Sequence, residues 1–99
     1  MEIIRCIADA IKNCADNRKL IPISERRVAV TVPKTLAEKG RLYLVAIYTG
    51  TDIPLILVRR AVKIGSSIGF VITSPALRKL AEIPSIRVRV CVSEAASPR

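Results

Sequence analysis

The chain has 99 residues, of which 51% are hydrophobic, and its 17 Lys and Arg outnumber eight Asp and Glu to give a net charge of +9. This length is enough for one small domain, and the hydrophobic content excludes a disordered chain, because disorder requires low hydrophobicity. Such a charge excess costs self-repulsion and is commonly tied to a negatively charged partner, with nucleic acid ahead of an anionic membrane.

The first 19 residues carry an apolar stripe at helical spacing, which predicts an amphipathic helix over residues 2–17. The stripe must be covered either by the rest of the chain or by a second copy, and both possibilities stay open. Its candidate dimerisation residues are Ile3, Ile4, Ile7 and Ile11. Charges throughout this segment argue against a signal peptide, and no apolar run reaches the roughly 18 residues of a membrane span. We therefore expect a protein that stays inside the cell and binds no membrane.

Short strands follow the helix. Leu20–Ile23 contains Pro22, which is typical of an edge strand. Val28–Val32 alternates as a half-buried strand does. The segment Lys34–Lys39 follows a proline and is predicted to be a short helix that ends at Gly40.

Two long extended segments come next, joined by a turn at residues 49–52. Arg41–Tyr48 is apolar on both faces, so we expect both faces to be covered. Ile53–Ile64 is the second extended segment of this hairpin.

The last third of the chain repeats the order of strand, helix and strand. Ile68–Thr73 is predicted as a strand, and Ser74 caps a short helix over Ala76–Glu82. Ile86–Val92 alternates cleanly between apolar and polar faces, and the polar residues 93–99 are expected to form a loose tail.

The chain also aligns with itself at a shift of 41 residues. Val30 then falls on Val71, Leu36 on Leu77 and Val45 on Ile86. Each repeat is too small to bury its own apolar faces, so we expect the units at residues 20–60 and 61–92 to pack together as one globular domain.

Three segments resemble the SpoVT/AbrB swapped-hairpin family. RVAVTVPKTLAEK at residues 27–39 is similar to its basic loop, valine-rich strand and short helix. KIGSSIGFVI at 63–72 is similar to the first hairpin of its antitoxin branch, and LAEIPSIRV at 80–88 to the passage into its second hairpin. The resemblance covers roughly residues 20–92 and implies a tandem pair of units that are usually found singly in dimers.

From these patterns we predict a mainly β protein with short helices (α+β), in which two swapped-hairpin-like units form a compact β-barrel-like pseudo-dimer behind the N-terminal helix. Members of the family present Arg and Lys to DNA and serve as transcription regulators or as the DNA-binding halves of antitoxins. The candidate DNA-binding residues are Arg26, Arg27, Lys34, Arg59, Arg60, Lys63, Ser66, Ser67 and Arg78.

The chemistry of these residues suits a duplex. Arginine binds phosphates and guanine edges, and the serine hydroxyls reach phosphate. Only three aromatic residues are present, too few to stack on single-stranded bases. Arg87 and Arg89 are better explained as a solvated face than as a second anion site.

No pattern indicates catalysis, a metal or a cofactor. The chain has no His, its carboxylates are scattered, and its serines lack a base. The cysteines, Cys6, Cys14 and Cys91, are odd in number and without a pairing pattern, which favours buried thiols over a disulfide framework.

The sequence therefore predicts a non-enzymatic, homodimeric regulator that binds double-stranded DNA in the cytoplasm, on the nucleoid. Two alternatives stay open. One is a structural or interaction protein, such as a ribosome-associated or viral assembly component. The other is an antitoxin with a protein partner. The absence of Gln hints at a thermophilic source.

Overall fold

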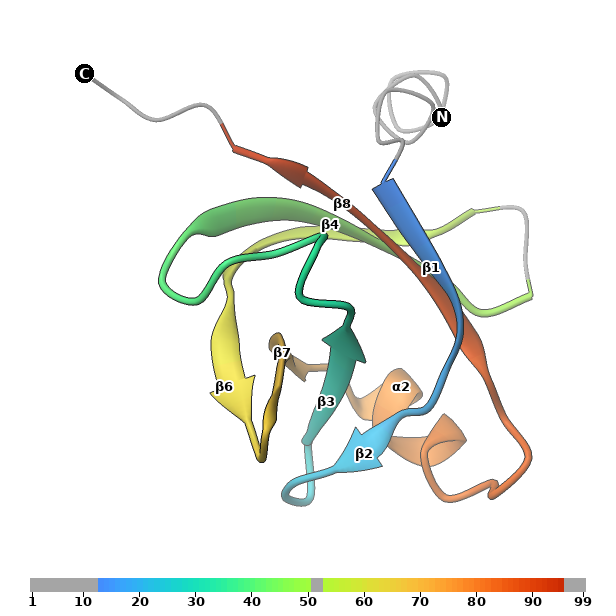
Figure 1. The fold of residues 1–99 in the computed structure, drawn as a ribbon. Helices are drawn as coiled ribbons and strands as arrows, with labels where there is room; N and C mark the ends of the chain where they lie inside the picture. Colours follow the sequence, from blue (N-terminus) through green and yellow to red (C-terminus); the bar gives the residue numbers. More distant parts are fainter. Residues whose placement is uncertain (1–12, 51–52, 96–99) are drawn as a thin grey trace.

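Two four-stranded antiparallel sheets make up most of the protein (Figure 1). The computed structural model describes residues 13–50 and 53–95. The first sheet contains, in spatial order, β1 (Asn13–Arg18), β8 (Val88–Glu94), β4 (Leu42–Tyr48) and β5 (Leu55–Arg60). The second contains β2 (Ile21–Pro22), β3 (Arg27–Val32), β7 (Ser67–Thr73) and β6 (Val62–Ile64), and one short helix, α2 (Pro75–Leu80), follows β7.

The mainly β class is confirmed, but the expected barrel is wrong because the two sheets do not close on each other. The predicted long strand Ile53–Ile64 shows why. It splits at the buried Ala61, where the chain leaves the first sheet as β5 and enters the second as β6. Because β5 pairs only with β4 and β6 pairs only with β7, both strands are edges, and each sheet keeps two edges.

Strand order relates the two halves of the chain. β3 pairs with β7 at the centre of the second sheet, and β4 pairs with β8 at the centre of the first. The outer strands are exchanged, since β1 pairs with β8 and β5 pairs with β4. Each half of the chain therefore contributes strands to both sheets, and separating the two halves would disrupt both sheets. The first four strands start at Asn13 in β1 and the last four at Leu55 in β5, so neither set starts at residue 20 or 61. The duplication with units at residues 20–60 and 61–92 stays a prediction.

The core lies between the sheets. Phe70 of β7 and Tyr43 of β4 meet edge to face, with ring centroids 5.9 Å apart. Valine and isoleucine side chains from both sheets surround this pair, and Leu77 of α2 packs against them. Buried β-branched side chains at alternate strand positions explain why these segments form sheets. The fully buried aliphatic residues include Val28, Val30, Val45, Ile47, Ile72, Val90 and Val92.

Several predicted elements are confirmed. The Leu20–Ile23 segment contains β2, an edge strand as its proline indicated. β4 lies inside the first sheet, with buried residues on both faces. α2 begins as expected, because Ser74 Oγ accepts a hydrogen bond from Leu77 N at 3.2 Å and Pro75 occupies the first turn.

Three local predictions are wrong. Residues 13–17 belong to β1 rather than to a helix, because β8 offers them a strand partner and tertiary pairing overrides the helical pattern. Residues 34–39 form turns, in which Tyr43 Oη accepts a hydrogen bond from Glu38 N at 2.7 Å. The tail is ordered through Ala95, whose N donates to Leu42 O at 2.9 Å. The expected helix over the first 12 residues, with Ile3, Ile4, Ile7 and Ile11, lies outside the described residues.

The cysteine prediction is also wrong, because Cys14 and Cys91 form a disulfide between β1 and β8. The two residues stand opposite each other in the strand register. Cys91 packs with Ala46 and the partly buried Tyr48 on the face of the first sheet away from the main core. Pairing therefore follows from the fold, which brings together residues 77 positions apart.

Gly69 is required by the close approach of β7 to β3. A Cβ atom at this position would lie 2.0 Å from Val30 O and 2.9 Å from Thr31 Cα. We expect Gly69→Ala to destabilise the fold by about 3 kcal/mol or more, because backbone atoms cannot yield as a flexible side chain does. Urea denaturation measures the change, with the exposed Ser66→Ala as control. A loss below about 1 kcal/mol would contradict this packing.

Candidate nucleic-acid interface

The net positive charge of the chain is carried by its described part. These residues include fourteen Lys and Arg and five Asp and Glu, a net charge of +9 that equals the value for the whole sequence. Four of the five carboxylates are in ion pairs: Glu38 and Glu94 with Arg41, Glu82 with Arg78, and Asp16 with Arg89. Eleven basic residues of the described chain therefore have no carboxylate partner there.

Arg41 is the most strongly neutralised cation. The hydrogen bond that it donates to Glu94, with the negative charges of Glu94 and Glu38, raises the pKa of Arg41 above its ordinary value. Because two carboxylates already face this guanidinium, Arg41 is a poor phosphate ligand.

The hairpin loop, residues 23–26 between β2 and β3, is the most exposed basic segment that is also firmly held. Ile23 N and Ser24 N donate to Arg27 O at 3.0 and 3.4 Å. Ser74 N at the start of α2 donates to Arg26 O at 2.9 Å, and Arg78 Nε donates to Ser24 O at 2.7 Å. The loop is thus tied to the helix while its own side chains face solvent.

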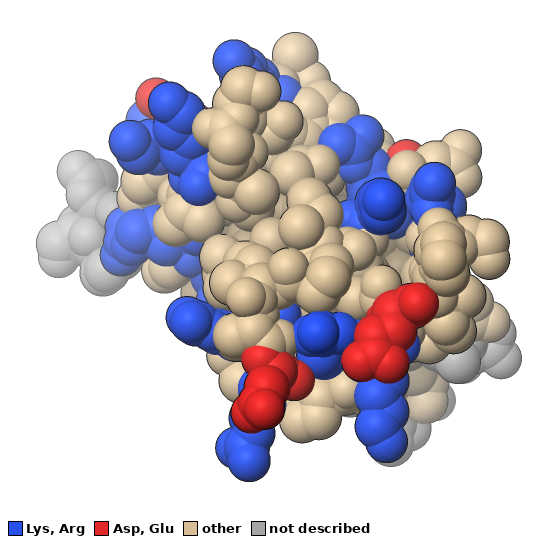
Figure 2. Space-filling model, turned by 90° about the horizontal axis from the view of Figure 1, so that it is seen from below, with Lys and Arg blue, Asp and Glu red and all other residues tan. Residues whose placement is uncertain are grey.

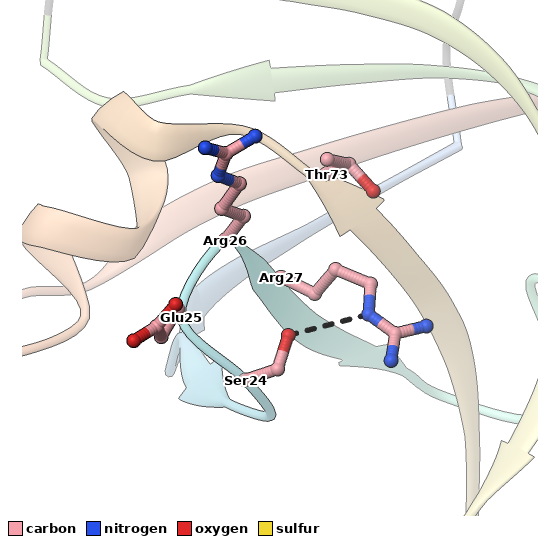
Figure 3. Close-up of a pocket in the computed structure, with 5 residues that line it drawn as sticks. All are labelled: Ser24, Glu25, Arg26, Arg27 and Thr73. Carbon is pink, nitrogen blue, oxygen red and sulfur yellow. Dashed lines mark hydrogen bonds between the residues drawn. The ribbon is translucent and has the colours of Figure 1, made fainter.

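Arg26 and Arg27 point to opposite sides of this loop, as expected for neighbours at the start of a strand (Figure 3). Arg27 Nε donates to Ser24 Oγ at 3.3 Å. The guanidinium of Arg26 has no hydrogen-bond or ion-pair partner among the described residues. An open hollow of about 420 Å³ lies here, lined by the loop and Thr73. Because the guanidinium groups diverge, they suit two separate phosphates better than one.

Arg78 comes to the same place but has a different role. Its side chain is 23% exposed, and it is engaged by Ser24 O and by the Glu82 carboxylate. These bonds hold the hairpin loop against α2, so Arg78 positions the loop. Lys79, which is not among the predicted residues, has an exposed side chain without a hydrogen-bond or ion-pair partner in the described chain. The feature of the sequence that could have identified Lys79 is its position directly after Arg78 in the predicted short helix.

Four further predicted residues gather at the opposite end of the β3–β7 pair. The register sets Arg27 opposite Thr73 at one end and Val32 opposite Ile68 at the other. At about 3.3 Å per residue, the two ends of β3 are roughly 17 Å apart. We call the residues near the Val32 end the second basic cluster: Lys34, Lys63, Ser66 and Ser67.

Arg59 and Arg60 belong to neither group. They lie in β5 of the first sheet, where Arg59 Nη1 donates to Val58 O at 2.8 Å and Arg60 Nη1 to Gly40 O at 2.6 Å. The nine predicted residues therefore occupy three places. Figure 2 shows basic side chains in several separate places on one face of the molecule, with uncharged atoms between them.

Arg87 and Arg89 do not form an anion site. Arg89 pairs with Asp16 at 3.1 Å, and Arg87 donates to the carbonyls of Pro84 and Ile86. β8 is an inner strand, so their charge does not protect an edge as expected. Within residues 13–50 and 53–95, no group of His, Cys, Asp and Glu could hold a metal ion, and no helix is long and apolar enough to cross a membrane.

Comparison with protein families, curated proteins and solved structures finds no match to this chain.

Proposed function

We propose that the protein binds double-stranded DNA through the hairpin loop and acts by binding, as a transcription regulator, rather than by catalysis. The observation that carries the proposal is the held, exposed loop with Arg26 and Arg27 directed to opposite sides. A positive group preset by its backbone loses little freedom when it meets a phosphate. This function would place the protein on the nucleoid, in the cytoplasm.

The position of the aromatic residues favours a duplex over a single strand. Phe70 and Tyr43 are buried in the core, and Tyr48 is half-buried. Single-strand binding relies on exposed rings that stack on bases. No ring on the described surface is fully exposed, so the basic groups would act mainly on the phosphate backbone.

The two ends of the β3–β7 pair suggest how one copy meets the duplex. A separation of roughly 17 Å corresponds to about five base pairs at the 3.4 Å spacing of each strand. The hairpin loop and the second basic cluster would then contact phosphates that are not neighbours. Such contacts set orientation and leave sequence preference to any base contact of Arg26 or Arg27.

Salt dependence of duplex binding tests the proposal. If Arg26, Arg27, Lys79, Lys34 and Lys63 each neutralise one phosphate, log affinity should fall against log salt with a slope of about −4.5. Fluorescence anisotropy with a labelled duplex measures the slope between about 50 and 300 mM salt. The matching single strand, which we expect to bind more weakly, is the control. Absence of binding to duplex at the lowest salt would overturn the proposal and favour an interaction protein.

A further inference from the structure

The two sheets have four edge strands, and three of them carry features that discourage pairing with another chain. β2 has two residues and contains Pro22. β6 has three residues, with Lys63 at its centre. In β1 the register shifts between Ala15 and Arg18, and Asn17 adopts φ 58°. Short length, proline, lysine and irregular backbone are the usual ways in which edges are protected.

β5 is the exception. Its first four residues, Leu55–Val58, are apolar and six residues pair regularly with β4. Leu55 is 39% exposed and Val58 46% exposed, although both are large apolar side chains. A regular, apolar and exposed edge is a template for strand addition.

The backbone hydrogen bonds indicate which groups of β5 face outward. Ala61 N donates to Arg41 O and Ala61 O accepts from Gly40 N, so Ala61 faces β4. Because the facing direction alternates along an antiparallel strand, the N–H and C=O groups of Ile56 and Val58 point away from β4. Consistently, Val58 O accepts a bond from the Arg59 side chain, and a carbonyl oxygen has a second lone pair for another donor.

We propose that β5 pairs antiparallel with β5 of a second copy of this chain. The apolar segment Leu55–Val58 is complementary to itself, which favours this occupant, and the position of the arginines favours this direction. Parallel pairing would set Arg59 beside Arg59 of the second copy. Antiparallel pairing about Leu57 instead sets each Arg59 opposite Leu55 and keeps the four arginines of β5 at the two ends of the interface. Ile56 then faces Val58 of the second copy, and the same surface serves both copies, as a two-fold interface requires.

The pairing has a structural consequence. It joins the first sheets of two copies into one continuous eight-stranded sheet. The order β1-β8-β4-β5 of one copy is followed by the reverse order, β5-β4-β8-β1, of the second. It also puts two hairpin loops on one particle, although the inference does not depend on DNA binding. Two linked basic surfaces bind a long polyanion more tightly than one.

Replacement of Val58 by Lys tests the interface. An added charge at this position should convert the dimer to a monomer, because two lysines would meet apolar residues across the axis. Ile83→Lys is the matched control, since Ile83 is also 46% exposed but lies outside the sheets. Sedimentation equilibrium of the full chain at about 10–100 µM measures the mass, because the fraction of dimer depends on the protein concentration. We expect dimers for the wild type and Ile83→Lys and monomers for Val58→Lys.

Val58→Pro is a second test, because it removes an N–H that β4 does not use and edge strands tolerate proline. Circular dichroism first establishes that both Val58 variants keep the wild-type strand signal. A wild type that is monomeric throughout this range would overturn the proposal, as would a Val58→Lys variant that is still dimeric. Loss of the dimer in Ile7→Lys with retention in both Val58 variants would equally overturn it, because the contact would then lie in the N-terminal segment.

Discussion

Simultaneous replacement of Arg26 and Arg27 by Ala should weaken duplex DNA binding by about 50-fold at 0.1 M salt. Counterion release contributes roughly 0.9 of a decade per phosphate contact at this concentration, so two contacts account for a little under two decades. The slope of log affinity against log salt should become less negative by about 2. Fluorescence anisotropy over a salt series measures both quantities.

The control variant is Arg59→Ala/Arg60→Ala, which removes the same charge from a different place. These side chains lie on β5 of the first sheet and donate to backbone carbonyls, so we expect less than about a threefold loss from the lower net charge alone. Equal losses in the two variants would show that net charge, and not the hairpin loop, determines binding. Because Arg59 and Arg60 lie in the edge strand β5, sedimentation must first establish that the two variants have the same oligomeric state.

Removal of the disulfide should have the largest effect on stability. The Cys14–Cys91 bond closes a loop of 77 residues. Chain-entropy arguments give about 4 kcal/mol for a loop of that length, because the crosslink restricts the unfolded chain. For a domain of this size that corresponds to a fall in Tm of roughly 15–30 °C. Calorimetry of Cys14→Ser/Cys91→Ser measures the change.

Cys6→Ser serves as the control and should leave Tm within a few degrees, since Cys6 is not part of this bond. Reductant should lower the Tm of the wild type and leave the double variant unchanged. If reductant has no effect on the wild type, the bond is not formed. Stable disulfides are common outside cells and unusual inside them except in hyperthermophiles, so the thermophilic source stays a prediction.

The predicted DNA site was only partly a property of the sequence. The arginine pairs and the net charge of +9 can be identified from the amino-acid sequence alone. The contact between Arg78 and Ser24, 54 residues apart, depends on α2 lying beside the β2–β3 loop. The same packing engages the Arg78 side chain with Ser24 O and the Glu82 carboxylate, so that it holds the loop against α2. Lys34 and Lys63 are separated from the loop because β3 is extended, a length that no motif records.

Local patterns determined the elements whose side chains needed only one kind of environment. The alternation of β-branched residues in β3 and β8 and the unbroken apolar run in β4 identify strands, since such side chains pack on a pleated surface. Ser74 followed by proline identifies the start of α2 through a bond within four residues. These features are satisfied by near neighbours and are therefore readable from the chain alone.

Tertiary structure decided the features that depend on distant partners. Residues 13–17 have a helical pattern, yet they form β1 because β8 provides hydrogen-bond partners that no local signal announces. Residues 34–39 form turns instead of the expected helix, and Tyr43 Oη accepts a hydrogen bond from Glu38 N. The disulfide and the open sheets likewise follow from the register of strands far apart in sequence. Composition and periodicity determined that the protein is mainly β. The pairing of strands far apart in sequence determined its disulfide, its sheet edges and the positions of its basic side chains.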